Sequence, residues 1–169
     1  MDVYLTRARN ALRTTTGALT AEQIARPVEG RWSIGQILEH LTLSFQANAG
    51  ALERAVASGA TRARPPTVVQ RLSRLVVIGL GYFPRAQAPE AVRPRGTVEV
   101  ERSREAIDEA LARLDAALVS AAELFGDNVP LLRHQYFGAL TVRQWCRFHW
   151  RHTLHHLRQV RARARAAEA

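Results

Sequence analysis

An all-helical fold is indicated most clearly by the stretch Cys146-Arg147-Phe148-His149-Trp150-Arg151-His152-Thr153-Leu154-His155-His156-Leu157-Arg158-Gln159. It holds four of the six histidines in the chain. Side chains at positions i and i+4 share one face of a helix, so His152 and His156 can reach the same point from successive turns. Trp145 and Phe148 fall on that same face, which predicts that it looks into the protein.

Helical periodicity extends over most of the remaining chain. Long helices are expected at about 2–16, 33–58, 103–125 and 141–165, and a shorter one at 67–78. Capping boxes at Ser33/Gln36 and Thr141/Gln144 mark two of the helix starts, and residues 20–23 can cap a short turn. The segment from Pro84 to Pro94 is expected to be a proline-rich loop, residues 134–138 a turn, and Val98–Val100 too short to indicate a sheet. The pattern predicts an all-α four-helix bundle with an additional short helix.

Length and composition favour one domain covering residues 1–169. The hydrophobic content of 47% supports a folded globule. No signal sequence or membrane-length apolar run is present, so we expect a cytoplasmic protein without a membrane partner. Because Cys146 is the single cysteine, the chain has no internal disulfide, and we expect this residue to be a small buried side chain of the core.

The net charge of +9 comes from 24 basic residues, all arginine, against 15 acidic ones. A basic surface can attract nucleic acid, and several arginines share one side of the last helix. The arginines are nevertheless scattered along the chain without a recognition motif or interleaved aromatic residues. A solvated charged face is therefore the favoured interpretation, and no nucleic-acid partner is expected.

The histidine face is a candidate metal site. Buried imidazoles need partners, because an unsatisfied buried polar group costs about 1–3 kcal/mol. Two ligands from one helix require a third from elsewhere, and His40 projects from a face of its helix that carries small or polar residues. His40, His152 and His156 would form a three-nitrogen site for zinc, nickel or iron with an open position for water or substrate. Spacing alone leaves a structural, histidine-rich helix as the alternative.

The other histidines are assigned less sharply. His149 and His155 can be partners of the ligands, ring-stacking neighbours or surface residues. His134 lies in a predicted turn, where we expect it to have a structural role or to lie at the rim of a pocket. No carboxylate shares the histidine faces, since Glu39 points about 100° from His40 on a helical wheel. The carboxylate base of a metalloprotease motif is therefore missing.

Two segments carry a resemblance to the DinB/YfiT-like superfamily of metal-binding four-helix bundles. Residues 32–41, which begin with Trp32 and include His40, resemble the second-helix signature of this superfamily. Residues 152–159 resemble its last-helix signature. The resemblance implies His40, His152 and His156 as the metal ligands. It also implies a small-molecule substrate and a homodimer, with a low-molecular-weight thiol as a cosubstrate of characterised relatives. The stretch 134–149 is similar to an uncharacterised branch of the superfamily.

Two kinds of function remain open. The first is a divalent-metal-dependent enzyme, a thiol S-transferase or a hydrolase, that uses the open three-histidine site. The second is a non-catalytic, metal-binding and dimer-forming protein linked to stress. A second apolar stripe on the last helix, at Trp150, Leu154 and Leu157, must be buried either inside the bundle or in a dimer contact.

Overall fold

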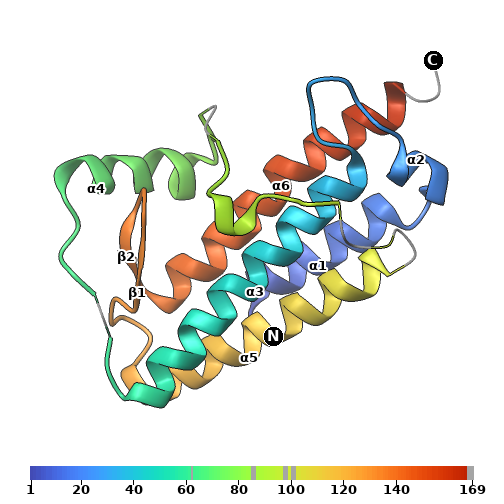
Figure 1. Cartoon of the computed structure of the whole chain (residues 1–169). Coiled ribbons are helices and arrows are strands. Elements are labelled where there is room, and N and C mark those ends of the chain that lie inside the picture. Colours follow the sequence, from blue (N-terminus) through green and yellow to red (C-terminus); the bar gives the residue numbers. More distant parts are fainter. Residues whose placement is uncertain (62, 85–86, 97–98, 100–101, 167–169) are drawn as a thin grey trace.

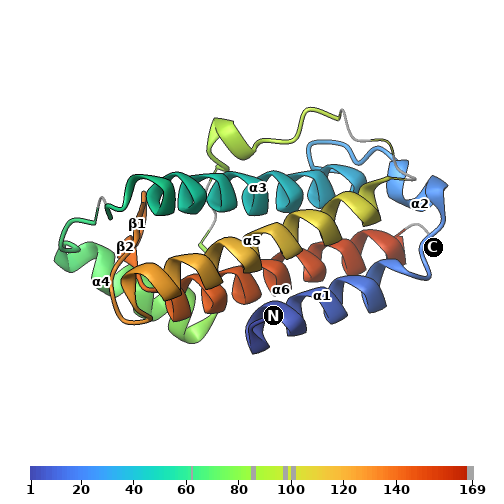
Figure 2. The ribbon, with the colours of Figure 1, turned by 90° about the horizontal axis from the view of Figure 1, so that it is seen from below.

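The computed structural model describes residues 1–61, 63–84, 87–96, 99 and 102–166 (Figure 1). In chain order the elements are α1 (Val3–Thr16), α2 (Ala21–Ala25), α3 (Ile34–Ser58), α4 (Val68–Arg74), the π-helix η1 (Leu75–Leu80), the 3-10 helix η2 (Glu90–Val92), α5 (Ser103–Phe125), β1 (Leu132–His134), β2 (Gly138–Leu140) and α6 (Val142–Ala166). The four long helices α1, α3, α5 and α6 lie side by side (Figures 1 and 2). The main packing pairs are α3 with α5 and α1 with α6, which confirms the predicted four-helix bundle.

Capping boxes fix where the helices begin. The Ser33 hydroxyl accepts from the Gln36 amide at 3.1 Å, and the Gln36 side chain accepts from the Ser33 amide at 2.9 Å. The same reciprocal pair forms at Thr141 and Gln144, as predicted, and also at Thr20/Gln23 and Thr67/Gln70. Each box satisfies amide donors that have no partner inside the helix. The start of α3 is thereby set six residues before His40 of the histidine site.

The predicted inward face of α6 is buried. Trp145 and Phe148 both belong to the core, together with apolar residues of α1, α3 and α5. The second stripe of α6 is partly covered within the chain, because Leu157 is fully buried, Trp150 packs partly against the core and Leu154 is half-buried. Burial inside the bundle therefore accounts for Leu157, while Trp150 and Leu154 are only half-buried and the dimer contact stays a prediction.

The segment 67–78 departs from the expected simple helix. An α-helix runs over Val68–Arg74 and then widens into the π-helix Leu75–Leu80, which Gly81 ends with φ +75°. Val68, Leu72 and Leu75 do share one side, but that side faces outward. In α4 the polar side faces the protein instead, and the Arg74 guanidinium donates to the carbonyl oxygens of Phe137 and Ala139. In the π-helix, Val77 and Ile78 are buried in the core.

A two-stranded antiparallel hairpin surrounds the predicted turn at 134–138. Its register pairs Leu132 with Leu140 and His134 with Gly138. The expectation of an entirely helical chain missed these strands, because three residues are too few to show the alternation of a strand. Gly138 adopts φ +67°, and a Cβ there would lie 2.8 Å from the Gln70 side chain, so only glycine fits.

Two further expectations concern the rest of the chain. The proline-rich loop contains the short helix η2, and the extended segment proposed for Val98–Val100 falls outside the described residues. Among the residues that are described, no helix is both long and apolar enough to cross a bilayer.

Candidate metal centre

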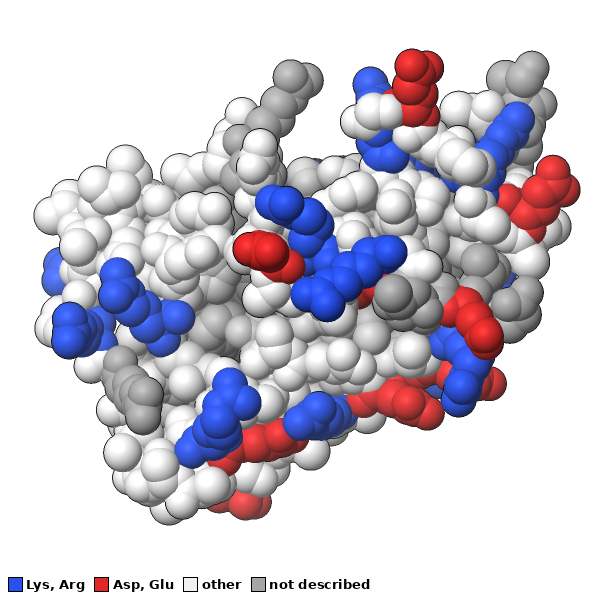
Figure 3. Space-filling model, in the orientation of Figure 1, with Lys and Arg blue, Asp and Glu red and all other residues white. Residues whose placement is uncertain are grey.

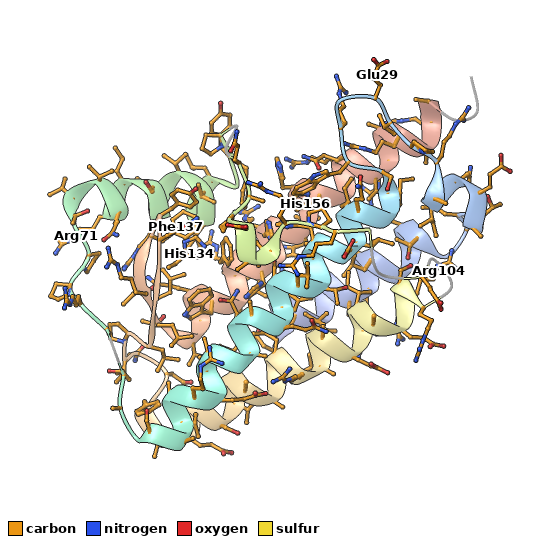
Figure 4. All side chains as sticks on the ribbon, viewed as in Figure 1. Glu29, Arg71, Arg104, His134, Phe137 and His156 are labelled. Carbon is orange, nitrogen blue, oxygen red and sulfur yellow. The ribbon has the colours of Figure 1, made fainter. Side chains whose placement is uncertain are left out.

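Three imidazoles from two helices converge in the middle of the bundle. His40 comes from α3, and His152 and His156 come from successive turns of α6. One ring nitrogen of each lies within 4.8 Å of the corresponding nitrogen of the other two. His40 and His156 are buried, and Figure 4 shows His156 at the centre of the molecule, beneath the loop that carries η2. The structure therefore brings together the three residues that the sequence singled out.

Hydrogen bonds on the far side of two rings aim their other nitrogens at one point. The Nδ1–H of His40 donates to the Val92 carbonyl at 2.7 Å, and the Nδ1–H of His156 donates to the Gln159 side-chain oxygen at 3.0 Å. In a neutral imidazole the nitrogen without the proton carries a lone pair. The Nε2 atoms of His40 and His156 are thus acceptors, and this arrangement is the one that commonly orients metal-binding histidines.

The Nε2 of His152 lies between these two acceptors. It is 3.2 Å from Nε2 of His40 and 3.1 Å from Nε2 of His156. A neutral His152 carries one proton: on Nε2 it can be donated to only one of the two neighbours and leaves the other acceptor unpaired, and on Nδ1 it leaves three lone pairs facing one another. A cation between the three nitrogens removes this conflict.

The distances fit a metal ion. With metal–nitrogen bonds of about 2.0–2.1 Å, nitrogens 3.1–3.2 Å apart subtend an angle of roughly 100° at the ion. Such an angle suits three ligands on one side of a tetrahedral or higher-coordinate ion, which leaves the opposite side open. The described residues offer no fourth histidine, cysteine or carboxylate in the cluster, so the open side would face water or substrate.

Burial keeps the three rings neutral. Desolvation lowers the pKa of His156 to about 3, lowers the pKa of His40, and lowers the pKa of His152 well below its usual value. The neighbouring histidines lower the pKa of His152 and His156 further, because adjacent positive charges repel. Neutral imidazole is the form that binds metal, so the site is prepared for a cation at neutral pH.

Aromatic rings wall the cluster. The Trp32 ring lies 5.0 Å from His40, Phe148 stacks on His152 at 5.4 Å, and Phe83 stacks on His155 at 4.9 Å. The Arg163 guanidinium holds the backbone at this point by donating from Nε to the Trp32 carbonyl at 2.5 Å. Apolar walls lower the local dielectric constant and so strengthen the interaction between an ion and a bound anion.

Glu39, next to His40 in sequence, points elsewhere as predicted. Its carboxylate accepts from the backbone amides of Arg95 at 3.2 Å and Gly96 at 2.8 Å. These bonds tie the loop after η2 to α3, and the same loop supplies the Val92 carbonyl to His40. Glu39 is therefore a support of the site, and its role is distinct from that of a general base.

The remaining histidines occupy three different environments. His155 accepts from the Gln159 side-chain nitrogen at 3.1 Å, which places it beside the ligands through a shared glutamine. His149 is fully buried and stacks on Trp145 at 5.8 Å. His134 lies on the hairpin, stacked on Phe137 at 4.2 Å and away from His156 (Figure 4). His149 and His134 are therefore packing residues of the α6 core.

Cys146 is also outside the site. It is buried, and desolvation together with the nearby Asp2 and Asp115 carboxylates raises the pKa of its thiol. A thiol that stays protonated is a poor nucleophile and a poor metal ligand. This environment agrees with its predicted role as a small core residue.

Sequence reasoning missed two supports of the cluster, Val92 and Phe83. The Val92 contribution is a backbone carbonyl in a proline-rich loop, and a carbonyl carries no side-chain signal. Phe83 follows the unusual π-helix, which no periodicity predicts. The third support, Gln159, was visible in the sequence, because it lies one helical turn after His155 and His156.

The protein is a small bundle of four long helices, and a buried cluster of three histidines lies between α3 and α6. Its class is therefore that of small helical bundles with a candidate metal centre. The chain matches the model of the DinB superfamily over residues 4–160 and belongs to that family. Neither the curated proteins nor the solved structures contain a significant match.

Proposed function

We propose that this protein is a divalent-metal-dependent enzyme that transfers a low-molecular-weight thiol to an electrophilic small molecule. The observation that carries the proposal is the convergence of three Nε2 atoms, two of which have lone pairs oriented by hydrogen bonds from Nδ1 to Val92 and Gln159. His40, His152 and His156 would hold the ion. Zinc, nickel and iron(II) all accept such imidazole ligands.

A divalent ion at this position supplies Lewis-acid chemistry, which lowers the pKa of a coordinated thiol or water. In the reaction the thiol releases its proton to solvent and its sulfur attacks the electrophilic carbon. The leaving group then departs with the bonding electron pair. The described residues place no carboxylate base in the cluster, which favours a thiol over water as the nucleophile because a thiol loses its proton more readily.

Charge around the cluster supports an anionic cosubstrate. Arg158 lies close enough to His155, and Arg163 close enough to His156, for each to lower the pKa of the neighbouring ring. Arg158 is exposed, so its guanidinium is free to bind a carboxylate of a thiol compound. The aromatic walls at Trp32 and Phe83 provide apolar surface for the electrophile.

The first experiment measures metal content in protein purified without a histidine tag. We expect one ion per chain in the native protein and its loss in His40→Ala and His156→Ala. His134→Phe is the matched control, since it removes a histidine that lies away from the ligands. Metal retained by His156→Ala would rule out the assigned ligand set.

The second experiment measures the disappearance of free thiol in the presence of an aromatic halide. We expect turnover by the metal-loaded protein and none by His156→Ala with unchanged circular dichroism. Hydrolysis of an ester without thiol consumption would instead identify a hydrolase.

The alternative is a non-catalytic metal protein. It is favoured by the way in which the cluster ties α3 to α6, because an ion bound across two helices stabilises the bundle. Stoichiometric metal together with a large fall in melting temperature on chelation, and no thiol or ester turnover, would support this second function. The predicted homodimer is tested in parallel by sedimentation velocity.

A further inference from the structure

Helix α4 and parts of the π-helix η1 expose apolar side chains on the outside of the molecule, whereas Val77 and Ile78 of η1 are buried in the core. Val68 is 82% exposed, Leu72 61%, Leu75 60% and Leu80 73%. Val69 and Tyr82 extend the same surface. We call these six residues the outer face of α4.

On its inner side this segment is held by polar contacts of α4 and by Val77 and Ile78 of η1, which pack into the core. Arg74 donates to the carbonyls of Phe137 and Ala139, and Gln70 lies against Gly138 of the hairpin. At the end of η1, the guanidinium groups of Arg147 and Arg151 both donate to the Gly79 carbonyl at 3.1 Å. These contacts hold the outer face away from the bundle. In α4, which has no buried residue, the arrangement is the reverse of an ordinary amphipathic helix on a globular protein.

The chain around the outer face carries only positive charge. No Asp or Glu occurs between Arg54 and Pro89, or between Asn128 and Ala167. These two stretches include α4, η1, the hairpin and α6. In Figure 3 the surface over α4 is white, and the charged residues next to it are blue. An occupant of this surface must therefore be both apolar and anionic.

Size and charge argue against a second copy of the chain as that occupant. Residues 68–80 span about 20 Å, and a helix face is about 10 Å wide, which gives a footprint of roughly 200 Å². A stable protein interface needs about 800 Å² from each partner. A two-fold contact would also bring Arg71 of each copy toward a surface without any carboxylate.

We propose that the outer face of α4 is a docking surface for the anionic face of a lipid bilayer. Valine, leucine and tyrosine side chains insert among the headgroups and upper acyl chains, and exposed arginines such as Arg71 bind lipid phosphates. The sequence predicted no membrane partner because no run is long enough to span a bilayer. Docking at the interface needs only a short amphipathic segment.

Docking would place the histidine cluster close to the bilayer. Tyr82 belongs to the outer face, and the next residue, Phe83, stacks on His155 beside the ligands. An electrophile dissolved in the membrane would then have a short path to the site. This last consequence rests on the proposed function, whereas docking itself does not.

The test is sedimentation of the full-length, metal-loaded protein with vesicles. One set contains equal parts phosphatidylglycerol and phosphatidylcholine, and the other contains phosphatidylcholine alone. We expect binding to the anionic vesicles, and a reduction of at least about tenfold in Leu72→Ser/Leu75→Ser. Both leucines are more than half exposed, so the fold and the metal content should persist. The matched control is Val119→Ser/Leu124→Ser on α5, whose side chains are similarly exposed and which should bind like the native chain.

Several results would overturn the proposal. One is failure of the native protein to sediment with anionic vesicles. Another is equal binding by Leu72→Ser/Leu75→Ser, which would mean that scattered arginines bind lipid without the outer face. A third is a dimer that the same double substitution converts to a monomer, with no vesicle binding, which would identify a second copy as the occupant. Thiol turnover is measured separately, so loss of docking and loss of activity can be told apart.

Discussion

Gln159 connects the metal centre to its surroundings, and replacing it with leucine removes that connection at nearly constant side-chain volume. In the native chain the Gln159 oxygen accepts from Nδ1 of His156 at 3.0 Å, and its nitrogen donates to His155 at 3.1 Å. Leucine keeps the bulk but leaves the His156 donor without an acceptor. His156 then loses the bond that holds its proton on Nδ1 and its lone pair toward the centre.

The size of the effect follows from the role of this bond. Loss of an outer partner of a metal-binding histidine weakens metal affinity by about 10–100-fold. This corresponds to about 1.4–2.7 kcal/mol of binding free energy. Gln159→Glu retains an acceptor and adds a negative charge near the ion, so we expect its affinity to equal or exceed that of the native chain.

The assay is competition between the protein and a chromophoric chelator for zinc, with untagged protein at neutral pH. Gln46→Leu is the matched control, because Gln46 is an exposed residue of α3. Its affinity should match that of the native chain. If Gln159→Leu binds zinc within about twofold of the native protein, the tautomer argument for His156 is refuted.

Three further predictions concern stability and reactivity. Glu39→Ala removes the acceptor for the amides of Arg95 and Gly96, so we expect it to lower the free energy of unfolding in urea by about 3 kcal/mol and to weaken zinc binding. The control Glu53→Gln breaks an exposed ion pair with Arg113 and should lower the free energy of unfolding by less than about 1 kcal/mol. Equal losses in the two variants would contradict the assigned role of Glu39. Burial lowers the pKa of His134 to about 4, so this side chain takes up a proton more readily in the unfolded chain than in the folded one. Its contribution to the free energy of unfolding is therefore fully present above pH 6.5, and about 3 kcal/mol is lost as the pH falls from 6.5 to about 4. His134→Phe should lack this part of the acid destabilisation, and parallel pH profiles for the two proteins would show that His134 is not buried in the native state. Finally, Cys146 should react with a disulfide reagent at least ~100-fold more slowly in the folded chain than in guanidinium, while fast labelling of the native protein would contradict its burial.

The sequence predicted the long helices because each carries a signal that does not depend on its neighbours. Apolar periodicity over 103–125 and the capping boxes at Ser33 and Thr141 are local properties, and the structure confirms the elements that they mark. Burial of the α6 face with Trp145 and Phe148 followed from the same periodicity. The hairpin at 132–140 was not predicted because its three-residue strands are too short to show alternation, and the π-helix was not predicted because no periodicity marks it. The contact between the two, in which Arg74 donates to the Phe137 and Ala139 carbonyls, joins residues more than sixty positions apart.

In the candidate site, too, some features follow from the local sequence and others depend on tertiary packing. The pairing of His152 with His156 follows from helix geometry, so the local sequence alone determines it. The approach of His40 to His152, the Val92 carbonyl behind His40 and the outward side of α4 depend on how separate segments pack. Side-chain hydrogen bonds between distant segments have no fixed spacing in the sequence. Tertiary structure alone therefore determined which nitrogens face the centre and which apolar residues remain uncovered.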